Sequence, residues 1–239
     1  MDIGSFVRQL TTSQVNRAGR KLRARERGES ITDDEANRAL GVLIEFRKAH
    51  RLPLTKATMG LRSAVTAEGC RVEVTQRLKR GRTMVDKLMR EPTMALANMQ
   101  DIGGCRAILE TIDEVRRVQQ RLSKRRGRPP ERLYDYVLRP RESGYRGVHV
   151  IVQYDGRNIE IQLRTRVMHE WAFYVERLSG RLKSDLKSAL GPREVLEWLE
   201  SVSQAMGLEE AGIIVDTPLV ERITRLREVA SRYLEGRRA

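Results

Sequence analysis

Two acidic residues, Asp101 and Glu160, lie in apolar stretches of the sequence and could act together on one cation. Asp101 opens an apparent strand in MQDIGGCR, and Glu160 lies in IEIQLRT about sixty residues later. In nucleotide sites, Mg²⁺ usually takes one or two protein carboxylates together with substrate phosphates. Taken singly, each residue is better explained as an ordinary ion-paired acid. Taken together, they are the candidate catalytic residues and the candidate ligands of Mg²⁺.

A basic segment with one hydroxyl group, RLKRGRTMVDK, runs from Arg77 to Lys87. The chain contains no GxxxxGK[ST] sequence, so a triphosphate would be held by side chains and not by a glycine-rich loop. Arginine offers a planar fork that can also stack on a purine, and lysine offers a compact charge for a phosphate. Seen alone, the segment is more typical of an amphipathic basic helix on the surface.

A third group of residues, DYVLRPRESGYRGVH, extends from Asp135 to His149. Its glycines allow close backbone approach, its cations suit phosphate, and Tyr145 offers a ring on which a base can stack. Seen alone, Tyr145 would be a half-buried core ring and His149 a hydrogen-bonded histidine of a sheet. The combination favours a loop that binds a phosphorylated base.

Positive charge is concentrated in the same part of the chain. The sequence has 46 Lys plus Arg against 32 Asp plus Glu, a net charge of +14, and the stretch from Arg116 to Arg146 alone supplies +8. A charge run of this kind can be no more than a solvated cationic face. Its position beside candidate chemistry favours phosphate or nucleic acid as a ligand. The candidate anion patch consists of Lys124, Arg125, Arg126 and Arg128.

Apolar residues at helical spacing predict helices on both sides of a β-rich middle region. A capping box at Thr32 and Glu35 marks the start of one helix, and Pro53 is expected to stop it from continuing. The segment Ile102–Leu109 is compatible with a strand. The predicted helices are Ser5–Arg27, Thr32–Arg47, Ile112–Leu122, Met168–Leu178, Pro192–Met206 and Leu219–Leu234.

The clearest local signal is a hairpin over Val148–Leu163, where two alternating runs flank Asp155-Gly156, a dipeptide that suits a type I′ turn. The alternate residues Ile159, Ile161 and Leu163 are expected to point into a core. Counting from the turn places four side chains together on the opposite face, namely His149, Ile151, Glu160 and Gln162.

These elements predict an α+β fold with a mixed sheet and flanking helices. We expect a helical flank over 1–65, a catalytic core over 66–180 and C-terminal helices over 181–239, together forming one catalytic domain. No apolar run is long enough to span a bilayer and no signal-peptide pattern opens the chain, so we expect a cytoplasmic protein that does not engage a membrane. Cys70 and Cys105 provide neither a disulfide framework nor paired zinc-ligand spacing.

Four blocks in this order and at these separations resemble the synthetase domain of the RelA/SpoT family, including its small stand-alone members: RLKRGRTMVDK, DIGGCR, DYVLRPRESGYRGVH and IEIQLRT. The resemblance runs from about Arg71 to Trp171. It implies a nucleotidyltransferase-like mixed sheet flanked by N- and C-terminal helices. It also implies transfer of the β,γ-diphosphate of ATP to a ribose 3′-hydroxyl, with release of AMP. The three histidines of the chain are too few and too scattered for the family's metal-dependent hydrolase site, so no hydrolase activity is expected.

The resemblance implies roles on the ATP side. Asp101 matches the family's magnesium ligand, and Glu160 matches the acid that completes the metal site or takes the 3′-hydroxyl proton. The arginines that sandwich adenine are matched by Arg77 and Arg106, and the triphosphate contacts are matched by Lys79, Thr83 and Lys87.

On the acceptor side, Tyr145 matches the ring that stacks on the acceptor's base. Arg141 and His149 match residues that line its phosphate and ribose, and Gln162 lies beside Glu160. The family often has Ser-Leu where this chain has Gly147-Val148, and Lys where it has Arg141.

Two acceptors are known for families of this type, and charge favours the 3′-terminal adenosine of tRNA. The basic loop and five N-terminal cations, Arg17, Arg20, Lys21, Arg23 and Arg25, fit the wide footprint that tRNA needs. The protein would then be a translation-inhibiting toxin, normally held by an antitoxin. The alternative acceptor is GDP or GTP, which would give the alarmone (p)ppGpp. A third interpretation, an inactive RNA-binding module, is disfavoured because a binder of polyanions has no need of both Asp101 and Glu160.

Overall fold

The computed structural model describes residues 10–124 and 129–235, and these residues form two compact units. Each unit is assembled from segments that are distant in sequence. Among the described residues, the first comprises 10–60, Thr75–Cys105 and Ile151–Glu160, and the second comprises Leu61–Val74, 106–124, 129–150 and 161–235.

Five strands form a mixed sheet with the order β1-β2-β5-β4-β3, which confirms the predicted α+β class. Buried and half-buried side chains alternate along the whole of β2, as expected for a strand with one apolar face. The strands are β1 (Val74–Leu78), β2 (Gly103–Leu109), β3 (Arg132–Asp135), β4 (Val148–Tyr154) and β5 (Arg157–Thr165).

The β4–β5 hairpin turns at Asp155-Gly156, as predicted. Both residues have positive φ angles, 50° and 69°, which is the backbone conformation that a type I′ turn requires. Ile159, Ile161 and Leu163 are buried, so the apolar alternation of β5 was assigned to the correct face.

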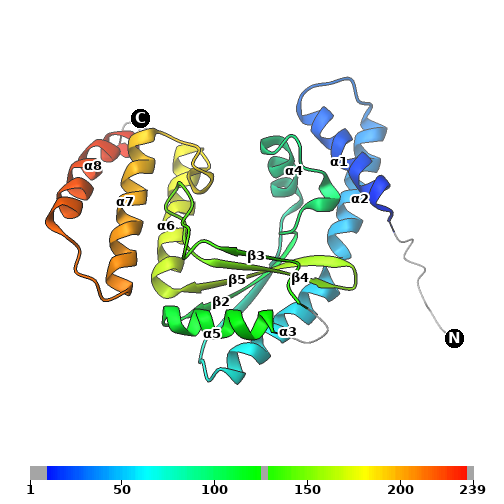
Figure 1. The fold of residues 1–239 in the computed structure, drawn as a ribbon. Helices are drawn as coiled ribbons and strands as arrows, with labels where there is room; N and C mark the ends of the chain where they lie inside the picture. The colour runs from blue at the N-terminus through cyan, green and yellow to red at the C-terminus, as the bar shows by residue number, and fades with distance from the viewer. Residues whose placement is uncertain (1–9, 125–128, 236–239) are drawn as a thin grey trace. The chain divides into compact units, whose positions relative to one another are not determined.

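In the first unit, α1 and α2 lie side by side, with α4 against α1 (Figure 1). Both α1 and α2 begin with a capping box, the second of them at Thr32 as predicted. Helix α2 ends at Lys48, before Pro53, as predicted, and Pro53 lies in the first turn of α3, where its missing N–H has no intrahelical partner to lose. The helices of this unit are α1 (Thr12–Glu26), α2 (Asp33–Lys48), α4 (Gly81–Arg90) and the 3₁₀ turn η1 (Leu96–Asn98). Helix α3 (Arg51–Ala67) has its residues up to Gly60 in the first unit and those from Leu61 on in the second.

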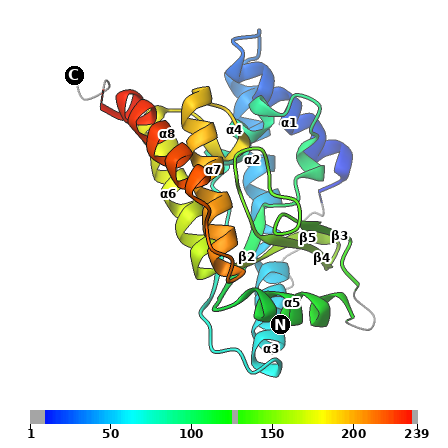
Figure 2. The same ribbon diagram turned by 60° about the vertical axis from the view of Figure 1, so that its left-hand side comes forward.

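In the second unit, α6, α7 and α8 pack next to one another (Figure 2). Their core contains Trp171, Val175, Val195 and Leu199, all nearly or fully buried. The longest helices of the described residues are still too short or too polar to cross a lipid bilayer. The helices here are α5 (Ile112–Ser123), α6 (Arg166–Leu182), the 3₁₀ turn η2 (Leu186–Ser188), α7 (Arg193–Glu210) and α8 (Thr217–Glu235).

Two helical glycines of the first unit should respond to alanine with opposite sign. A Cβ atom on Gly19 of α1 would lie 2.8 Å from the Cβ of Leu96, whereas one on Gly41 of α2 would meet nothing within 4 Å. We expect Gly19→Ala to lower the free energy of unfolding by about 1–2 kcal/mol through overpacking. Gly41→Ala should raise it by about 0.5–1 kcal/mol through helix propensity.

Urea unfolding followed by circular dichroism measures both changes. An equal gain in stability for the two variants would show that α1 does not pack on η1 as described.

Candidate active site

Asp101 is an acid of the first unit that is bound by two lysines. Its carboxylate accepts hydrogen bonds from the ammonium groups of Lys79 at 2.8 Å and Lys87 at 3.1 Å. All three side chains are largely covered, with 11–22% of their surface exposed. Lys79 follows β1, Lys87 lies on α4, and Asp101 immediately precedes β2, so the strand–turn–helix from β1 to α4 delivers both cations to one carboxylate.

The ionised form of Asp101 is favoured despite its burial. Desolvation by itself would raise the pKa of this carboxyl group, but the charges of Lys79 and Lys87 outweigh it, and the pKa lies below its ordinary value of 3.8. The negative charge of Glu160 acts in the opposite direction. Asp101 and Glu160 therefore interact electrostatically within the first unit, as expected from the sequence.

Glu160 is half-buried in the middle of β5, where alternation gives it the opposite face from Ile159 and Ile161. Burial raises the pKa of Cys105 on β2 to about 12, with a smaller contribution from the charge of Glu160. In the described part of the chain, no group of three or more His, Cys, Asp and Glu side chains forms a metal-ligand cluster. Any divalent cation here would therefore have few protein ligands, as is usual for Mg²⁺ bound to a nucleotide.

The segment RLKRGRTMVDK is not one surface helix. Arg77 lies in β1 and is exposed, and α4 begins only at Gly81. Thr83 and Lys87 are one helical turn apart on α4, so their side chains lie on the same side of it. The residue before α4 makes no side-chain cap, and the first turn contains no acid, so its amide groups are suited to an anion.

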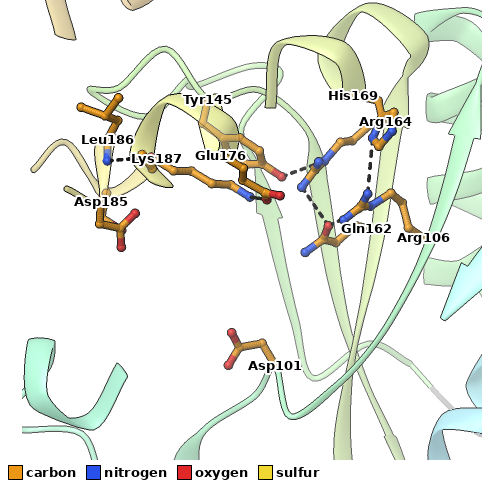
Figure 3. Close-up of polar contacts among 12 residues, drawn as sticks. Asp101, Arg106, Tyr145, Gln162, Arg164, His169, Glu176, Asp185, Leu186 and Lys187 are labelled. Atoms are coloured by element: carbon orange, nitrogen blue, oxygen red, sulfur yellow. Dashed lines mark hydrogen bonds and ion pairs between the residues drawn. The ribbon is translucent and has the colours of Figure 1, made fainter. Parts of the chain in front are cut away.

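A second polar network lies in the second unit (Figure 3). Arg106 of β2 donates hydrogen bonds to Gln162 at 3.4 Å and approaches Nδ1 of His169 at 3.3 Å. The guanidinium group of Arg164 donates to Gln162 at 2.8 Å and to the hydroxyl of Tyr145 at 3.0 Å. Two arginines therefore converge on the amide oxygen of Gln162, and this network places Arg106 and Gln162 together.

Tyr145 is fully buried. The sequence predicted a ring on which a base could stack, and in this structure the ring is not accessible to a base. Its hydroxyl lies 2.5 Å from Nε2 of His149, and the ring packs in the core of the second unit. Gly147 makes this placement feasible, since a Cβ atom there would lie 3.1 Å from the Tyr145 hydroxyl and 3.3 Å from Cγ of Arg164. Stacking of Tyr145 on an acceptor base would require this ring to be uncovered.

His149 is a hydrogen-bonded histidine of the sheet, which was the simpler of the two interpretations of this residue. The ring that remains partly exposed is Tyr136, whose hydroxyl accepts a hydrogen bond from Arg141 at 2.8 Å. The guanidinium group of Arg141 also lies 4.3 Å from the centre of the Tyr136 ring. Exposed Arg141 and half-buried Tyr136 thus form a cation–π pair, and both residue types suit a phosphorylated base.

Helix α7 holds the loop over residues 136–147 in place. Ser203 donates a hydrogen bond to the carbonyl of Gly144 at 2.5 Å, and Arg146 forms a buried ion pair with Glu210 at 2.6 Å. Gly144 has a φ angle of 82°, and a Cβ atom there would lie 2.9 Å from Cα of Glu200, so only glycine fits this contact. A cavity of about 580 Å³ between this loop and α7 is lined by Arg141, Arg146, Glu200 and Gln204, among others.

The proposed cationic footprint for tRNA is smaller than the sequence indicates. Lys124 is exposed, and Arg125, Arg126 and Arg128 lie outside the described residues. Three of the N-terminal cations are engaged within the first unit. Lys21 pairs with Glu35, Arg25 pairs with Asp33, and Arg23 donates to the carbonyls of Leu88 and Met94.

Three residues of the second network escaped prediction: Arg164, Glu176 and Lys187. Arg164 has no exposed surface, and Lys187 lies 3.3 Å from Glu176. The sequence signal for Arg164 was present, since it is the next same-face residue after Glu160 and Gln162 on the hairpin. Glu176 and Lys187 carry no comparable signal, because only the packing of α6 against η2 brings them together.

Residues 76–178 match the family described as the region found in RelA / SpoT proteins. The chain is 29% identical over 142 residues to a GTP pyrophosphokinase of Bacillus subtilis, covering 55% of this chain and 65% of that protein. It is 25% identical over 156 residues to a GTP pyrophosphokinase of Escherichia coli, covering 61% of this chain and 21% of that protein. The chain thus spans less than two thirds of the length of these relatives.

Solved structures resemble the fold over most of the chain. The small alarmone synthetase 1 of Bacillus subtilis bound to its product pppGpp aligns with a TM-score of 0.56 and 23% identity, covering 76% of this chain and 94% of that one. A GTP pyrophosphokinase family protein of Streptococcus pneumoniae aligns with the same TM-score and 24% identity, covering 80% and 94%.

The sheet order, the flanking helices and these structural neighbours define an α+β protein with the nucleotidyltransferase-like fold of the small alarmone synthetases. The matched region extends from β1 into α6 and contains Asp101 with its two lysines, Glu160, Arg106 and Arg164. Residues 76–178 of the chain therefore contain the region found in RelA / SpoT proteins, as the four sequence blocks indicated.

The contact between Lys79 and Asp101 predicts a change in titration. Because the folded-state pKa of Asp101 is lowered, its ionisation stabilises the fold above the ordinary pKa of 3.8, and this stabilisation is lost as the pH falls through the lowered pKa. Lys79→Met should raise the pKa of Asp101, because burial would then be opposed by Lys87 alone. Carboxyl ¹³C NMR titration measures it, with the exposed Lys48→Met as the control. An unchanged pKa in Lys79→Met would contradict the ion pair.

The hydroxyl of Tyr145 should matter far more for stability than that of Tyr136. Tyr145→Phe would leave the Nε–H of buried Arg164 without its partner, and we expect a loss of about 1–3 kcal/mol in the free energy of unfolding. Tyr136→Phe should change it by no more than about 0.5 kcal/mol, since its partner Arg141 is exposed to water. Equal changes in the free energy of unfolding of the two variants would show that the Tyr145 hydroxyl does not make the buried contacts with Arg164 and His149.

Proposed function

We propose that the protein transfers the β,γ-diphosphate of ATP to the 3′-hydroxyl of a guanine nucleotide, releasing AMP and forming a (p)ppGpp-type product. The observation that carries this proposal is the first unit's ionised Asp101, clamped by Lys79 and Lys87 beside Glu160, within a RelA/SpoT region.

The ATP side is supported by the strand–turn–helix from β1 to α4. Lys79, Thr83 and Lys87 are positioned to follow a chain of phosphates, with the uncapped start of α4 adding amide donors. Arg77 and Arg106 are proposed to hold the adenine by stacking, as the family resemblance implies. In this structure Lys79 and Lys87 pair with Asp101. When a triphosphate and its cation bind, the two lysines would pair with the phosphates and the cation would pair with Asp101.

Asp101 and Glu160 suit Mg²⁺ by their chemistry. They are oxygen ligands that interact with each other, and the ammonium groups on Asp101 occupy the position of a cation. When bound, the ion would neutralise charge on the phosphates. The chain's own contribution is to keep Asp101 ionised through Lys79 and Lys87, and Glu160 is proposed to accept the proton of the attacking 3′-hydroxyl.

The chemistry needs positioning more than a covalent nucleophile. The acceptor's 3′-oxygen attacks the β-phosphorus, the bond from that phosphorus to the oxygen bridging the α- and β-phosphates breaks, and AMP leaves with that oxygen. Arg141, His149 and Gln162 are proposed to orient the acceptor, with either Tyr136 or an uncovered Tyr145 stacking on its base.

A guanine nucleotide is preferred to tRNA as the acceptor. The relatives named above are GTP pyrophosphokinases, and one structural neighbour is described as bound to pppGpp. The charge pattern that favoured tRNA loses weight because Lys21, Arg23 and Arg25 already have partners within the first unit. Neither the comparisons nor the geometry supports an antitoxin partner.

Purified protein with ATP labelled in its β,γ-phosphates and Mg²⁺ should transfer label to GDP or GTP, resolved by thin-layer chromatography. Transfer to deacylated tRNA alone would overturn the guanine nucleotide assignment. Transfer to neither would favour the inactive RNA-binding module.

Removing either carboxylate should abolish turnover without unfolding the protein. We expect Asp101→Asn and Glu160→Gln each to lower kcat by a factor of about 10² or more, since charge stabilisation at a reacting phosphate contributes at least this much. Asp155→Asn is the matched control, because this exposed acid lies at the hairpin turn, where asparagine is equally suitable. Circular dichroism confirms folding. Retained turnover in either active-site variant would refute the assignment of these acids.

A further inference from the structure

The second unit contains a buried arginine whose donors are incompletely used. Arg164 has no exposed surface, its Nε donates to Tyr145, and its Nη2 donates to Gln162. Its Nη1 is buried and has no hydrogen-bond partner among the residues that the structure describes. A buried guanidinium group with unused donors is costly, so a native structure with one calls for an explanation such as a ligand.

Lys187 lies beside this arginine with a single acidic neighbour. Its ammonium group is 3.3 Å from the carboxylate of Glu176 and 4.8 Å from the centre of the Tyr145 ring. Burial and the charge of Arg164 lower the pKa of Lys187 to about 8, although Glu176 acts to raise it. Lys187 therefore also lacks full compensation for its charge.

The cluster as a whole is positive. Arg106, Arg164 and Lys187 all act electrostatically on Glu176, and together they outweigh its burial and lower its pKa. Half of the Glu176 side-chain surface is exposed, whereas Lys187 is 25% exposed. Figure 3 shows Lys187, Glu176 and Arg164 directed toward one another. Glu176 is thus the member of this pair that borders water more, so its carboxylate has room to leave the cations without crossing the core.

We propose that Arg164 and Lys187 form a binding site for a phosphate group of the guanine nucleotide, and that Glu176 occupies this site when the nucleotide is absent. The site assigns a role to Arg164, which the fourth sequence block contains without a role, and to Glu176 and Lys187, which lie outside the four blocks. It rests on the proposed function for the identity of its ligand.

Two contacts connect this site to the acceptor residues. Arg164 and His149 share the hydroxyl of Tyr145, at 3.0 Å and 2.5 Å. The backbone carbonyl of Lys187 accepts a hydrogen bond from Ser143 at 2.9 Å, which ties η2 to the loop over residues 136–147. A phosphate bound by Lys187 and Arg164 would therefore belong to a ligand whose remaining parts meet this loop. Guanidinium and ammonium donors are the groups that recognise phosphate most strongly.

Isothermal titration calorimetry with GDP and guanosine tests the site through changes of opposite sign. Lys187→Met removes an attractive charge and should weaken GDP binding about tenfold while leaving guanosine binding unchanged. Glu176→Gln removes the competing carboxylate and should tighten GDP binding about threefold. A purely structural ion pair predicts that both variants change in the same direction.

Two further variants complete the test. Lys187→Arg keeps the charge and should bind GDP within about threefold of wild type. Lys183→Met removes an exposed lysine on the same turn of chain and should have no effect. Circular dichroism and urea unfolding show whether Lys187→Met is folded. If it is not folded, Lys187→Arg tests the site in its place, because the proposal requires this charge-conserving variant to keep an affinity for GDP close to that of wild type.

Inorganic pyrophosphate is the second probe, because it separates this site from the proposed acceptor. If wild type binds no guanine nucleotide, the proposed function fails, and the pyrophosphate series still tests the cationic site. If wild type binds GDP but Lys187→Met binds it equally well, the site is refuted and the proposed function stands. An equal change in affinity, in the same direction, for Lys187→Met and Glu176→Gln would also refute the proposed phosphate site.

Discussion

The constraint on which the first unit depends is the burial of a carboxylate that must stay ionised. Asp101 loses most of its hydration, and only the two ammonium groups on it offset that loss. Lys79 and Lys87 reach it from different elements, so the turn between β1 and α4 has to be placed accurately. Arg47 contributes to this by donating to the carbonyl of Lys79 at 2.7 Å, and the amide of Lys79 bonds to the carbonyl of Ile102 at 2.8 Å. The backbone around the acid is therefore fixed by groups that do not touch it.

A comparable constraint acts in the second unit, where one buried hydroxyl group has to contact both a guanidinium group and an imidazole nitrogen. Tyr145 connects His149 of β4 to Arg164 of β5, and it reaches both because Gly147 has no side chain. A residue with a Cβ atom at 147 would press on the hydroxyl and on Arg164. The departure from the family pattern at this position thus has a local physical consequence, the closed position of the Tyr145 ring.

Much of the fold follows from local sequence signals. The Thr32 capping box, the Asp155-Gly156 turn and the alternation of β5 each act within a few residues, so they were predicted correctly. The helix that begins at Thr32 ends before Pro53, as expected, but the position of Pro53 in the first turn of a further helix was not predicted. Tyr145 was placed in contact with the acceptor base because its burial depends on α6 and α7, which are far away in sequence. The pair of Lys187 and Glu176 could not be predicted, since no spacing rule connects η2 with α6.

Net charge is a weak guide to the ligand for the same reason. A total of +14 counts every arginine equally, but the fold uses arginines in different ways. Arg23 caps carbonyls, Arg146 is buried against Glu210, and Arg164 is buried with donors unused. The charge of Arg146 is compensated by its carboxylate partner, whereas buried Arg164 keeps donors that a ligand can use. Recognition of a small anion is therefore decided by a few incompletely compensated cations in a covered site, whatever the sign of the whole surface.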